Sequence, residues 1–233
     1  MYSRPQKLAA EFLGTFAVVL FSAGAVCADQ LVRSVNPTGA IGPLGIALAY
    51  GFAFASLSAA LAHVSGGHFN PAVTIGFWVT RRCTTFDTLA YWLAQITGAV
   101  AAAYLLRWVV PEDAWQTVAL GTPELASGLT RSPALLIEGL ATFVLTFVVF
   151  AAAKHPSPGA LSAMAGGLAI TAGSLFSAPF TGGAMNPARA FGPALMAGHW
   201  TSHGVYWVGP LAGGMLAAWT YQAVIARPTN LPD

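Results

Sequence analysis

Charged residues are scarce in this chain. Only 8% of its 233 residues are Asp, Glu, Lys or Arg, whereas an ordinary soluble domain has about 25%. Hydrophobic residues make up 56%. A chain with so little charge cannot cover a surface that faces water, so we expect much of its surface to face a lipid bilayer. The formal net charge of +2 is small, and it provides no basic patch of the kind that nucleic-acid binding requires.

Clusters of cysteine or of catalytic side chains are lacking as well. The two cysteines, Cys27 and Cys83, are isolated in the sequence, which predicts neither a disulfide framework nor a metal site. We find no Ser/His or Asp/Asp pairing and no His-Glu metal motif of the kind that marks an active site. We therefore predict that the protein is not an enzyme and has no metal or cofactor.

Long apolar runs, in contrast, are abundant. A helix needs about 20 apolar residues to cross a bilayer. Six runs are this long, which predicts an all-α integral membrane protein with six transmembrane helices. The runs cover residues 8–28, 41–63, 86–106, 134–153, 160–180 and 204–226.

The connections between these runs differ in their content of lysine and arginine. Six such residues fall on the side of the N-terminus and three on the other side. Because cytoplasmic connections are enriched in positive charge, both termini are predicted to be cytoplasmic, and the membrane to be the plasma (inner) membrane. The six are Arg4, Lys7, Arg81, Arg82, Lys154 and Arg227, and the three are Arg33, Arg107 and Arg131.

One short motif occurs twice. Gly-Gly-x-x-Asn-Pro-Ala is found at residues 66–72 and again at 182–188, and "EFLGTF" at 11–16 matches "EGLATF" at 138–143. Three predicted spans accompany each copy, so the second half would enter the membrane from the opposite side. The chain is therefore predicted to be a single channel domain, 1–233, built from inverted 3+3 repeats of about 1–110 and 130–230.

Each copy of the motif opens a segment that is too short to span. At 1.5 Å per residue, 70–80 and 186–197 would cover about half of the hydrocarbon thickness. Asparagine is a favoured N-cap, and proline suits the first helical position. We expect two re-entrant half-helices that meet by their N-termini. The Gly-Gly segments before them should be extended, non-helical backbone. Such backbone is tolerated at this depth only where it is buried in protein or lines a water-filled cavity.

This geometry predicts a pore for small neutral solutes. Each helix N-terminus carries a partial positive charge of about half an elementary charge, which repels cations, and the asparagine amides can donate hydrogen bonds to a neutral solute. The motif residues are Asn70, Pro71, Ala72, Asn186, Pro187 and Ala188. The backbone carbonyls expected to line the pore are those of Gly66, Gly67, His68, Phe69, Gly182, Ala184 and Met185.

Two carboxylates lie inside predicted spans at matching positions of the repeat, Glu11 and Glu138. They could form a proton or ion site of a coupled transporter. Alternatively, each could accept hydrogen bonds from the non-helical backbone of its own half. We favour the second interpretation, with Glu11 bracing residues 64–69 and Glu138 bracing 180–185.

Four stretches, in this order, carry a resemblance to a known family: "AAEFLGTF", "SGGHFNPAVT", "GGAMNPARAFGPAL" and "YWVGPLAGG". On these residues the chain resembles the aquaporin (major intrinsic protein) family over nearly its whole length. The resemblance implies six tilted helices with two half-helices. It also implies a homotetramer in the lipid bilayer with one pore per subunit.

The same resemblance implies a narrow external selectivity filter formed by Tyr50, Ser174, Gly183 and Arg189. Water-specific members typically have His in place of Ser174 and Phe in place of Tyr50. Glycerol facilitators typically pair Trp and Phe and place Asp directly after the arginine, where this chain has Ala190. The filter departs from both branches, and the "GGAMNPARAFGPA" run resembles branches that also pass ammonia or hydrogen peroxide. The resemblance therefore implies a passive water channel with relaxed selectivity that also passes these two solutes and excludes protons and ions.

Three alternatives remain open at this point. If Ser174 and Gly183 set the width rather than Tyr50, the channel would be a facilitator for glycerol, urea or metalloids. An ion-coupled secondary transporter would need ionisable groups at the site, where only Arg189 is found. A structural junction protein would form tetramers that conduct no solute.

Overall fold

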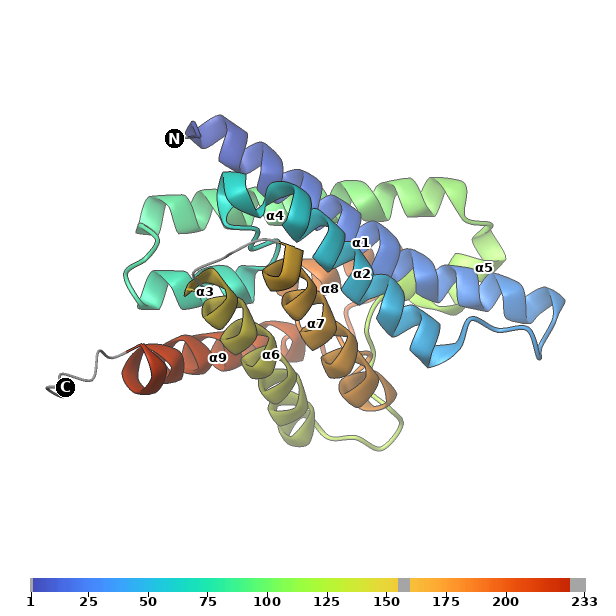
Figure 1. Cartoon of the computed structure of the whole chain (residues 1–233). Helices are drawn as coiled ribbons and strands as arrows, with labels where there is room; N and C mark the ends of the chain where they lie inside the picture. Colours follow the sequence, from blue (N-terminus) through green and yellow to red (C-terminus); the bar gives the residue numbers. More distant parts are fainter. Residues whose placement is uncertain (1, 155–159, 227–233) are drawn as a thin grey trace, which may run out of the picture.

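The computed structural model describes residues 2–154 and 160–226, and helices make up most of these two ranges (Figure 1). This confirms the predicted all-α fold. The turn predicted at 154–159 falls almost entirely outside the described residues, and so does Arg227.

All six predicted spans are found as helices. Five are long and apolar enough to cross a membrane on their own. The sixth, α9, has 16 residues and continues directly into a π-helical turn, Tyr221–Ile225. The six helices are α1 (Arg4–Val35), α2 (Gly42–Ser65), α4 (Thr85–Val109), α6 (Arg131–Lys154), α7 (Ala160–Thr181) and α9 (Val205–Thr220).

Helix α1 is longer than its apolar run predicted, with 32 residues. At its start Pro5 occupies the first turn, where the missing N–H costs nothing. Near its end Arg33 donates a hydrogen bond to Asp29 one turn earlier, at 2.7 Å, a spacing that supports a helix outside the hydrocarbon region. Hydropathy detects only the part of a helix that lies in lipid, which explains the difference.

The two half-helices are α3 (Pro71–Val79) and α8 (Pro187–Ala197), and both begin at the predicted residues. The Asn70 side chain caps α3 by accepting from the N–H of Ala72 at 2.8 Å. The Asn186 side chain caps α8 by accepting from Ala188 at 3.0 Å and from Arg189 at 3.3 Å. An asparagine cap therefore starts each half-helix.

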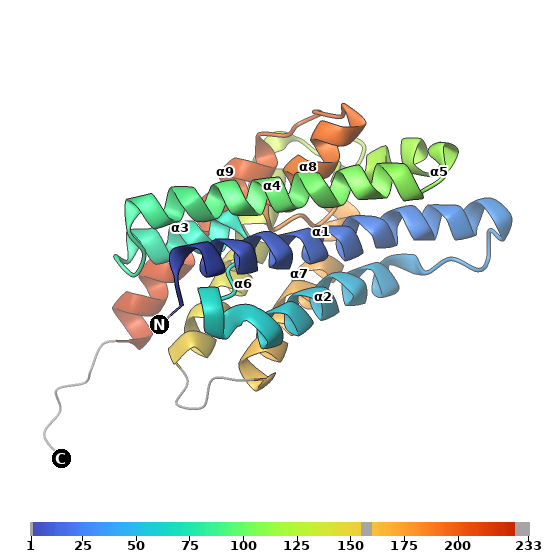
Figure 2. The same ribbon diagram turned by 90° about the horizontal axis from the view of Figure 1, so that it is seen from above.

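The packing of the long helices repeats between the halves. In the first half α1 packs against α2 and α4, and Figure 2 shows it between them. In the second half α6 holds the corresponding place, against α7 and α9. The half-helices cross over, because α3 packs mainly on α9 and α8 mainly on α4. At these crossings Gly214 faces the carbonyl of Ala72 and Gly192 that of Ala99, with no room for a side chain, as is common in close membrane helix pairs.

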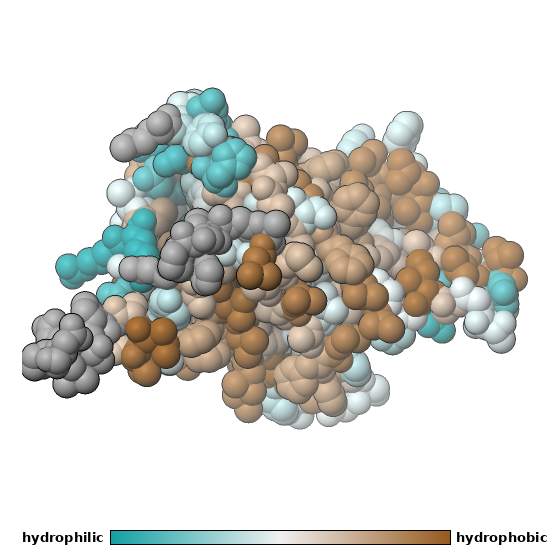
Figure 3. Space-filling view, in the orientation of Figure 1, coloured by the Kyte–Doolittle hydropathy of each residue, from teal (hydrophilic) through white to brown (hydrophobic). Residues whose placement is uncertain are grey.

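The outward faces of the long helices are apolar. Figure 3 shows hydrophobic residues over most of the visible face and hydrophilic ones gathered near the N-terminus. Exposed apolar patches of this extent are unusual on a soluble protein and fit a surface covered by lipid. Representative exposed side chains are Leu13 on α1, Phe52 on α2, Leu93 on α4 and Leu168 on α7.

The connection between the halves has structure that the sequence did not predict. A short helix, α5 (Glu112–Thr117), is followed by a turn, η1 (Ala119–Gly121). Both are too short to produce a periodic apolar pattern. The buried side chains of Trp115 and Leu120 hold them on the bundle, in one apolar cluster with Val19 and Ala23 of α1.

Candidate pore

The two motif asparagines meet in the interior of the protein. The side-chain amide of Asn70 donates to the carbonyl of Met185 at 2.9 Å, and that of Asn186 donates to the carbonyl of Phe69, also at 2.9 Å. Both side chains are buried. This reciprocal pair joins the residues just before the two half-helices, so that α3 and α8 meet by their N-termini. Each amide has two N–H groups and uses one of them in this pair.

The segments before the half-helices are not extended, which corrects the expectation from the sequence. Their φ angles are left-handed at matching positions: 94° at Gly66 and 77° at Gly182, 64° at Gly67 and 63° at Gly183. Glycine adopts such angles without steric cost, which explains the paired Gly-Gly. The last residue of each segment is also left-handed, with φ of 48° at Phe69 and 51° at Met185, a conformation that costs a side-chain-bearing residue about 1–3 kcal/mol.

The seven carbonyls expected to line the pore fall into two groups. Those of Phe69 and Met185 accept from the asparagine amides, and that of Ala184 accepts from the hydroxyl of Tyr50 at 2.9 Å. No donor among the described residues reaches the other four. These four belong to Gly66, Gly67, His68 and Gly182.

The carboxylate of Glu11 is fully buried and lies against the first of these segments. It accepts from the N–H groups of His68 at 3.0 Å and Phe69 at 2.8 Å. The hydroxyl of Ser65 and the amide of Gln95 donate to it at 2.7 Å each. Both oxygens are thus occupied.

The carboxylate of Glu138 has the matching place in the second half and is also fully buried. It accepts from the N–H groups of Ala184 at 3.1 Å and Met185 at 2.7 Å, and from the hydroxyl of Thr181 at 2.6 Å. The geometry favours two carboxylates that hold loops over two carboxylates that bind a transported ion.

Two tyrosines that the sequence analysis missed complete these contacts. Tyr91 donates to the carbonyl of Ser65, and Tyr206 donates to the carbonyl of Thr181, each at 2.9 Å. Ser65 and Thr181 each come directly before Gly-Gly in the two motifs. A comparison of the two copies could therefore have identified Ser65 and Thr181 as equivalent residues. Each tyrosine also begins a Tyr-Trp pair, at 91–92 on α4 and at 206–207 on α9, so the repeat relates the two tyrosines as well. Gln95, which also donates to Thr74 at 2.9 Å, carries no sequence signal.

The four predicted filter residues are all buried. The hydroxyl of Tyr50 binds the carbonyl of Ala184, directly after Gly183, which connects α2 to the segment before α8. Ser174 lies on α7, one turn before Ser177. A Cβ at Gly183 would lie 3.2 Å from the hydroxyl oxygen of Ser177, so α7 packs closely against this glycine. Ser174 shares no hydrogen bond with the other three.

Arg189, the fourth filter residue, is 3% exposed. Its Nη1 donates to the carbonyl of Gly121 at 2.8 Å, and its Nε has no partner among the described residues. The turn η1 presents this carbonyl, with φ of 57° at Leu120 and 74° at Gly121. A Cβ at Gly121 would lie 2.7 Å from the carbonyl oxygen of Ala23, so glycine is required there. The sequence analysis missed this positioning turn.

A cavity of about 370 Å³ leads to the first carbonyl segment. It is formed by α2, α6 and α7, and the segment contributes Gly66 and Gly67. Ser58, whose hydroxyl has no partner among the described residues, and His63 also line it. Gly66 and Gly67, two of the four residues whose carbonyls have no donor, thus line this cavity, which we interpret as the pore entrance at the end of the bundle nearer the N-terminus.

The fold and the paired asparagines define a polytopic membrane channel. The sequence model of the Major intrinsic protein family matches residues 2–221, so the chain belongs to this family, the aquaporins. It is 40% identical to "Aquaporin TIP2-1" of Arabidopsis thaliana over 91% of this chain and 84% of that protein. It is 36% identical to "Aquaporin-4" of Mus musculus over 97% of this chain and 69% of that protein.

A solved structure supports the fold. The aquaglyceroporin from Plasmodium falciparum superimposes with a TM-score of 0.83, covering 96% of this chain and 97% of that chain at 22% sequence identity. The protein is therefore an integral membrane protein of a channel family and not an enzyme, and it is a passive channel for water or small solutes. The resemblance seen in the sequence is confirmed.

Proposed function

We propose that this protein is a passive water channel that also passes ammonia and hydrogen peroxide and excludes protons and ions. The reciprocal pair of Asn70 and Asn186 carries the proposal. Each amide keeps one N–H group, and the partial positive charges of two helix N-termini point to the same place. A solute oxygen accepts hydrogen bonds there, whereas a cation is repelled.

Arg189 forms a second barrier to cations. Its hydrogen-bond partner, the carbonyl of Gly121, is neutral, and no carboxylate among the described residues forms an ion pair with the guanidinium. Its remaining N–H groups can donate to a passing solute. Two positive regions in series, Arg189 and the paired helix ends, therefore act against cations, while a neutral molecule gains hydrogen bonds at both.

The width of the filter depends on Tyr50. Its hydroxyl bond to Ala184 holds the ring between α2 and the segment before α8, which favours the passage of water over that of glycerol. The relatives also favour a water channel over a glycerol channel. The two relatives at 40% and 36% identity are named aquaporins, whereas the aquaglyceroporin is only 22% identical.

A glycerol facilitator is the second candidate, since Ser174 and Gly183 present only small side chains where they line the filter. A coupled transporter is disfavoured, because protein donors already occupy the oxygens of both Glu11 and Glu138. A structural junction protein would show no flux at all.

Stopped-flow light scattering on proteoliposomes tests the proposal. An osmotic step in sucrose should shrink the vesicles much faster than protein-free vesicles. A step in glycerol should be followed by no faster re-swelling than in protein-free vesicles, whereas Tyr50→Ala should re-swell rapidly. Rapid re-swelling of the unmodified protein would favour the glycerol facilitator, and shrinkage no faster than in protein-free vesicles would contradict a channel.

For the assembly, we propose one channel domain of two inverted halves, about 1–110 and 130–230, that forms a homotetramer with one pore per subunit. We further propose a plasma (inner) membrane location with both termini in the cytoplasm. The excess of lysine and arginine in the connections on the side of the N-terminus supports this orientation.

A further inference from the structure

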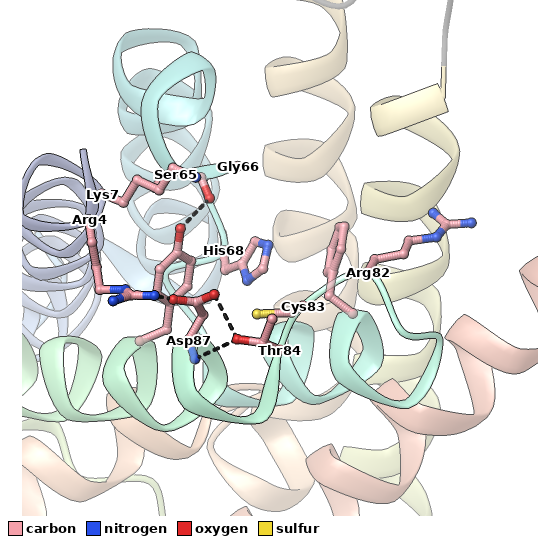
Figure 4. Close-up of a pocket in the computed structure, with 11 residues that line it drawn as sticks. Arg4, Lys7, Ser65, Gly66, His68, Arg82, Cys83, Thr84 and Asp87 are labelled. Carbon is pink, nitrogen blue, oxygen red and sulfur yellow. Dashed lines mark hydrogen bonds and ion pairs between the residues drawn. The ribbon is translucent and has the colours of Figure 1, made fainter. Parts of the chain in front are cut away.

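A second cavity lies beside the pore entrance and is separate from it. It has a volume of about 490 Å³ and is lined by the start of α1, the end of α2, the turn from α3 to α4 and the start of α4 (Figure 4). The pore entrance lies between α2, α6 and α7 instead. Gly66 lines both cavities, so the first carbonyl segment separates them. The second cavity shares Gly66 and His68 with the segment whose carbonyls are expected to line the pore, but its charged residues Arg4, Lys7 and Asp87 have no part in the proposed water path.

Positive charge dominates the lining of the cavity. Arg4 and Lys7 contribute two positive charges and Asp87 contributes one negative charge, while Arg82 lines the cavity with its guanidinium directed away from these groups. Asp87 is already engaged, because one of its oxygens accepts from Nε of Arg4 at 2.9 Å and the other accepts from the hydroxyl of Thr84 at 2.7 Å. The cavity therefore has an excess of positive charge.

Lys7 is the charge without a partner. Its side chain is half-buried and extends from α1 toward Ser65 and Gly66 (Figure 4). The ammonium group has no ion pair or hydrogen bond with any described residue. Arg4 uses only its Nε, so its two terminal N–H₂ groups remain free to donate. Arg82 points away from these two, with its guanidinium 4.9 Å from the centre of the Phe150 ring.

The other side chains do not offset this charge. Cys83 lies in the cavity as a free thiol. Burial raises the pKa of this thiol above its ordinary value, so it stays protonated and neutral. An ammonium group and a free edge of a guanidinium in one cavity form a donor set that suits a phosphate group.

The surroundings of the cavity are those of a membrane surface. Arg4 lies over the ring of Phe86, with 4.6 Å between the guanidinium carbon and the ring centre. From Phe86 an apolar face continues along α4 through Leu89 and Leu93, all more than half exposed and at helical spacing. Trp78, also exposed, is a residue type enriched at the membrane interface. A cationic cavity thus adjoins an apolar strip that could contact acyl chains.

We propose that this cavity binds the phosphate group of an anionic molecule, and that the ligand is an anionic phospholipid whose acyl chains lie along α4. Lys7 and the free N–H groups of Arg4 bind the phosphate. The inference does not depend on which solute the pore conducts.

Lipid binding is tested on the purified full chain in a neutral detergent. Native mass spectrometry would compare phosphatidylglycerol with phosphatidylcholine of the same acyl chains. We expect preferential binding of phosphatidylglycerol, and about fivefold weaker binding of that lipid to Lys7→Gln, since one surface charge contributes about 1 kcal/mol. The matched control is Arg81→Gln. This change also removes one positive charge, but from an exposed residue of the turn between α3 and α4 that does not line the cavity.

A second experiment, with soluble phosphate compounds, distinguishes a lipid headgroup from a free phosphate as the ligand. The thermal unfolding temperature would be measured with added inorganic phosphate, with glycerol 3-phosphate and with phosphatidylglycerol. We expect only the lipid to raise it, and more in the unmodified protein and in Arg81→Gln than in Lys7→Gln. An equal rise with soluble phosphate, lost in Lys7→Gln, would keep the phosphate site and overturn the lipid as its ligand.

Two results would overturn the site itself. One is equal binding of the two lipids to the unmodified protein. The other is an equal loss of phosphatidylglycerol binding in Lys7→Gln and Arg81→Gln, which would indicate general attraction to the charged surface. Neither readout measures flux, so a failure of this proposal and a failure of the proposed water channel can be told apart.

Discussion

Arg189 has 3% of its surface exposed and lies in the interior of a bundle whose outer surface is apolar. A charged side chain is costly at such a place and is expected to serve a function there. Among the described residues, its side chain donates a hydrogen bond only to the neutral carbonyl of Gly121. The guanidinium therefore keeps both its charge and further donors, which is what a filter for neutral solutes requires.

Replacing Arg189 by Ala should raise the permeability to larger neutral solutes such as urea and glycerol severalfold, and should let protons or cations leak. The physical reason is that the change removes a positive charge and widens the aperture at once. Re-swelling in urea and in glycerol, together with a pH-sensitive dye inside the vesicles, would measure both effects. Arg81→Ala, at an exposed turn, should change neither. An Arg189→Ala channel with unaltered selectivity would remove the arginine from the filter.

At the scale of elements, the two half-helices depend on segments that are held by buried carboxylates. Three donors converge on Glu138: the hydroxyl of Thr181 and the N–H groups of Ala184 and Met185. Without these bonds, nothing else among the described residues would satisfy the two N–H groups. The left-handed backbone before α8 would then lose its main support.

We expect Glu138→Gln to lower the free energy of unfolding by about 2–3 kcal/mol, since an amide offers one acceptor oxygen in place of two and bonds to a carboxylate are the stronger ones. Water permeability should fall as well, because Ala184 and Asn186 would shift. Thermal unfolding in detergent and stopped-flow shrinkage would be compared with Glu112→Gln, an exposed residue of α5. If Glu138→Gln unfolded at the same temperature as Glu112→Gln, the bracing role would be wrong.

At the scale of the whole molecule, the halves are interlocked rather than merely adjacent. The half-helix of each half packs on the last long helix of the other half, and the asparagine pair joins the two half-helices at their N-termini. The candidate path lies inside a single chain. A tetramer would then contain four independent pores.

We predict that native mass spectrometry will give a mass of four chains of 24.0 kDa each. Mixed tetramers with a blocked subunit, Ser174→Trp, should lose water permeability in direct proportion to the blocked fraction, because each pore belongs to one subunit. Vesicles containing only Ser174→Trp should shrink as slowly as empty ones. A much steeper loss in the mixtures would instead indicate a path shared between subunits.

The sequence by itself determined the six long helices and the places where the two half-helices begin. These features depend on local causes: apolar runs long enough for a bilayer, and Asn-Pro as a helix start. The duplicated motif also predicted that the two asparagines would meet, because an inverted repeat leaves no other arrangement for two helices of half the span. Glu11 and Glu138 were found for the same reason, as equivalent positions of the repeat.

Only the tertiary structure decided which partners these residues have. The bond from Tyr50 to Ala184 joins residues 134 positions apart, and the bond from Arg189 to Gly121 joins residues 68 apart. Neither has a local motif, because the geometry of such a bond is set by how the helices pack and not by neighbouring residues. The left-handed backbone that replaced the expected extended segments has the same origin. It directs the N–H groups toward the buried carboxylates, an arrangement that exists only after the helices have come together.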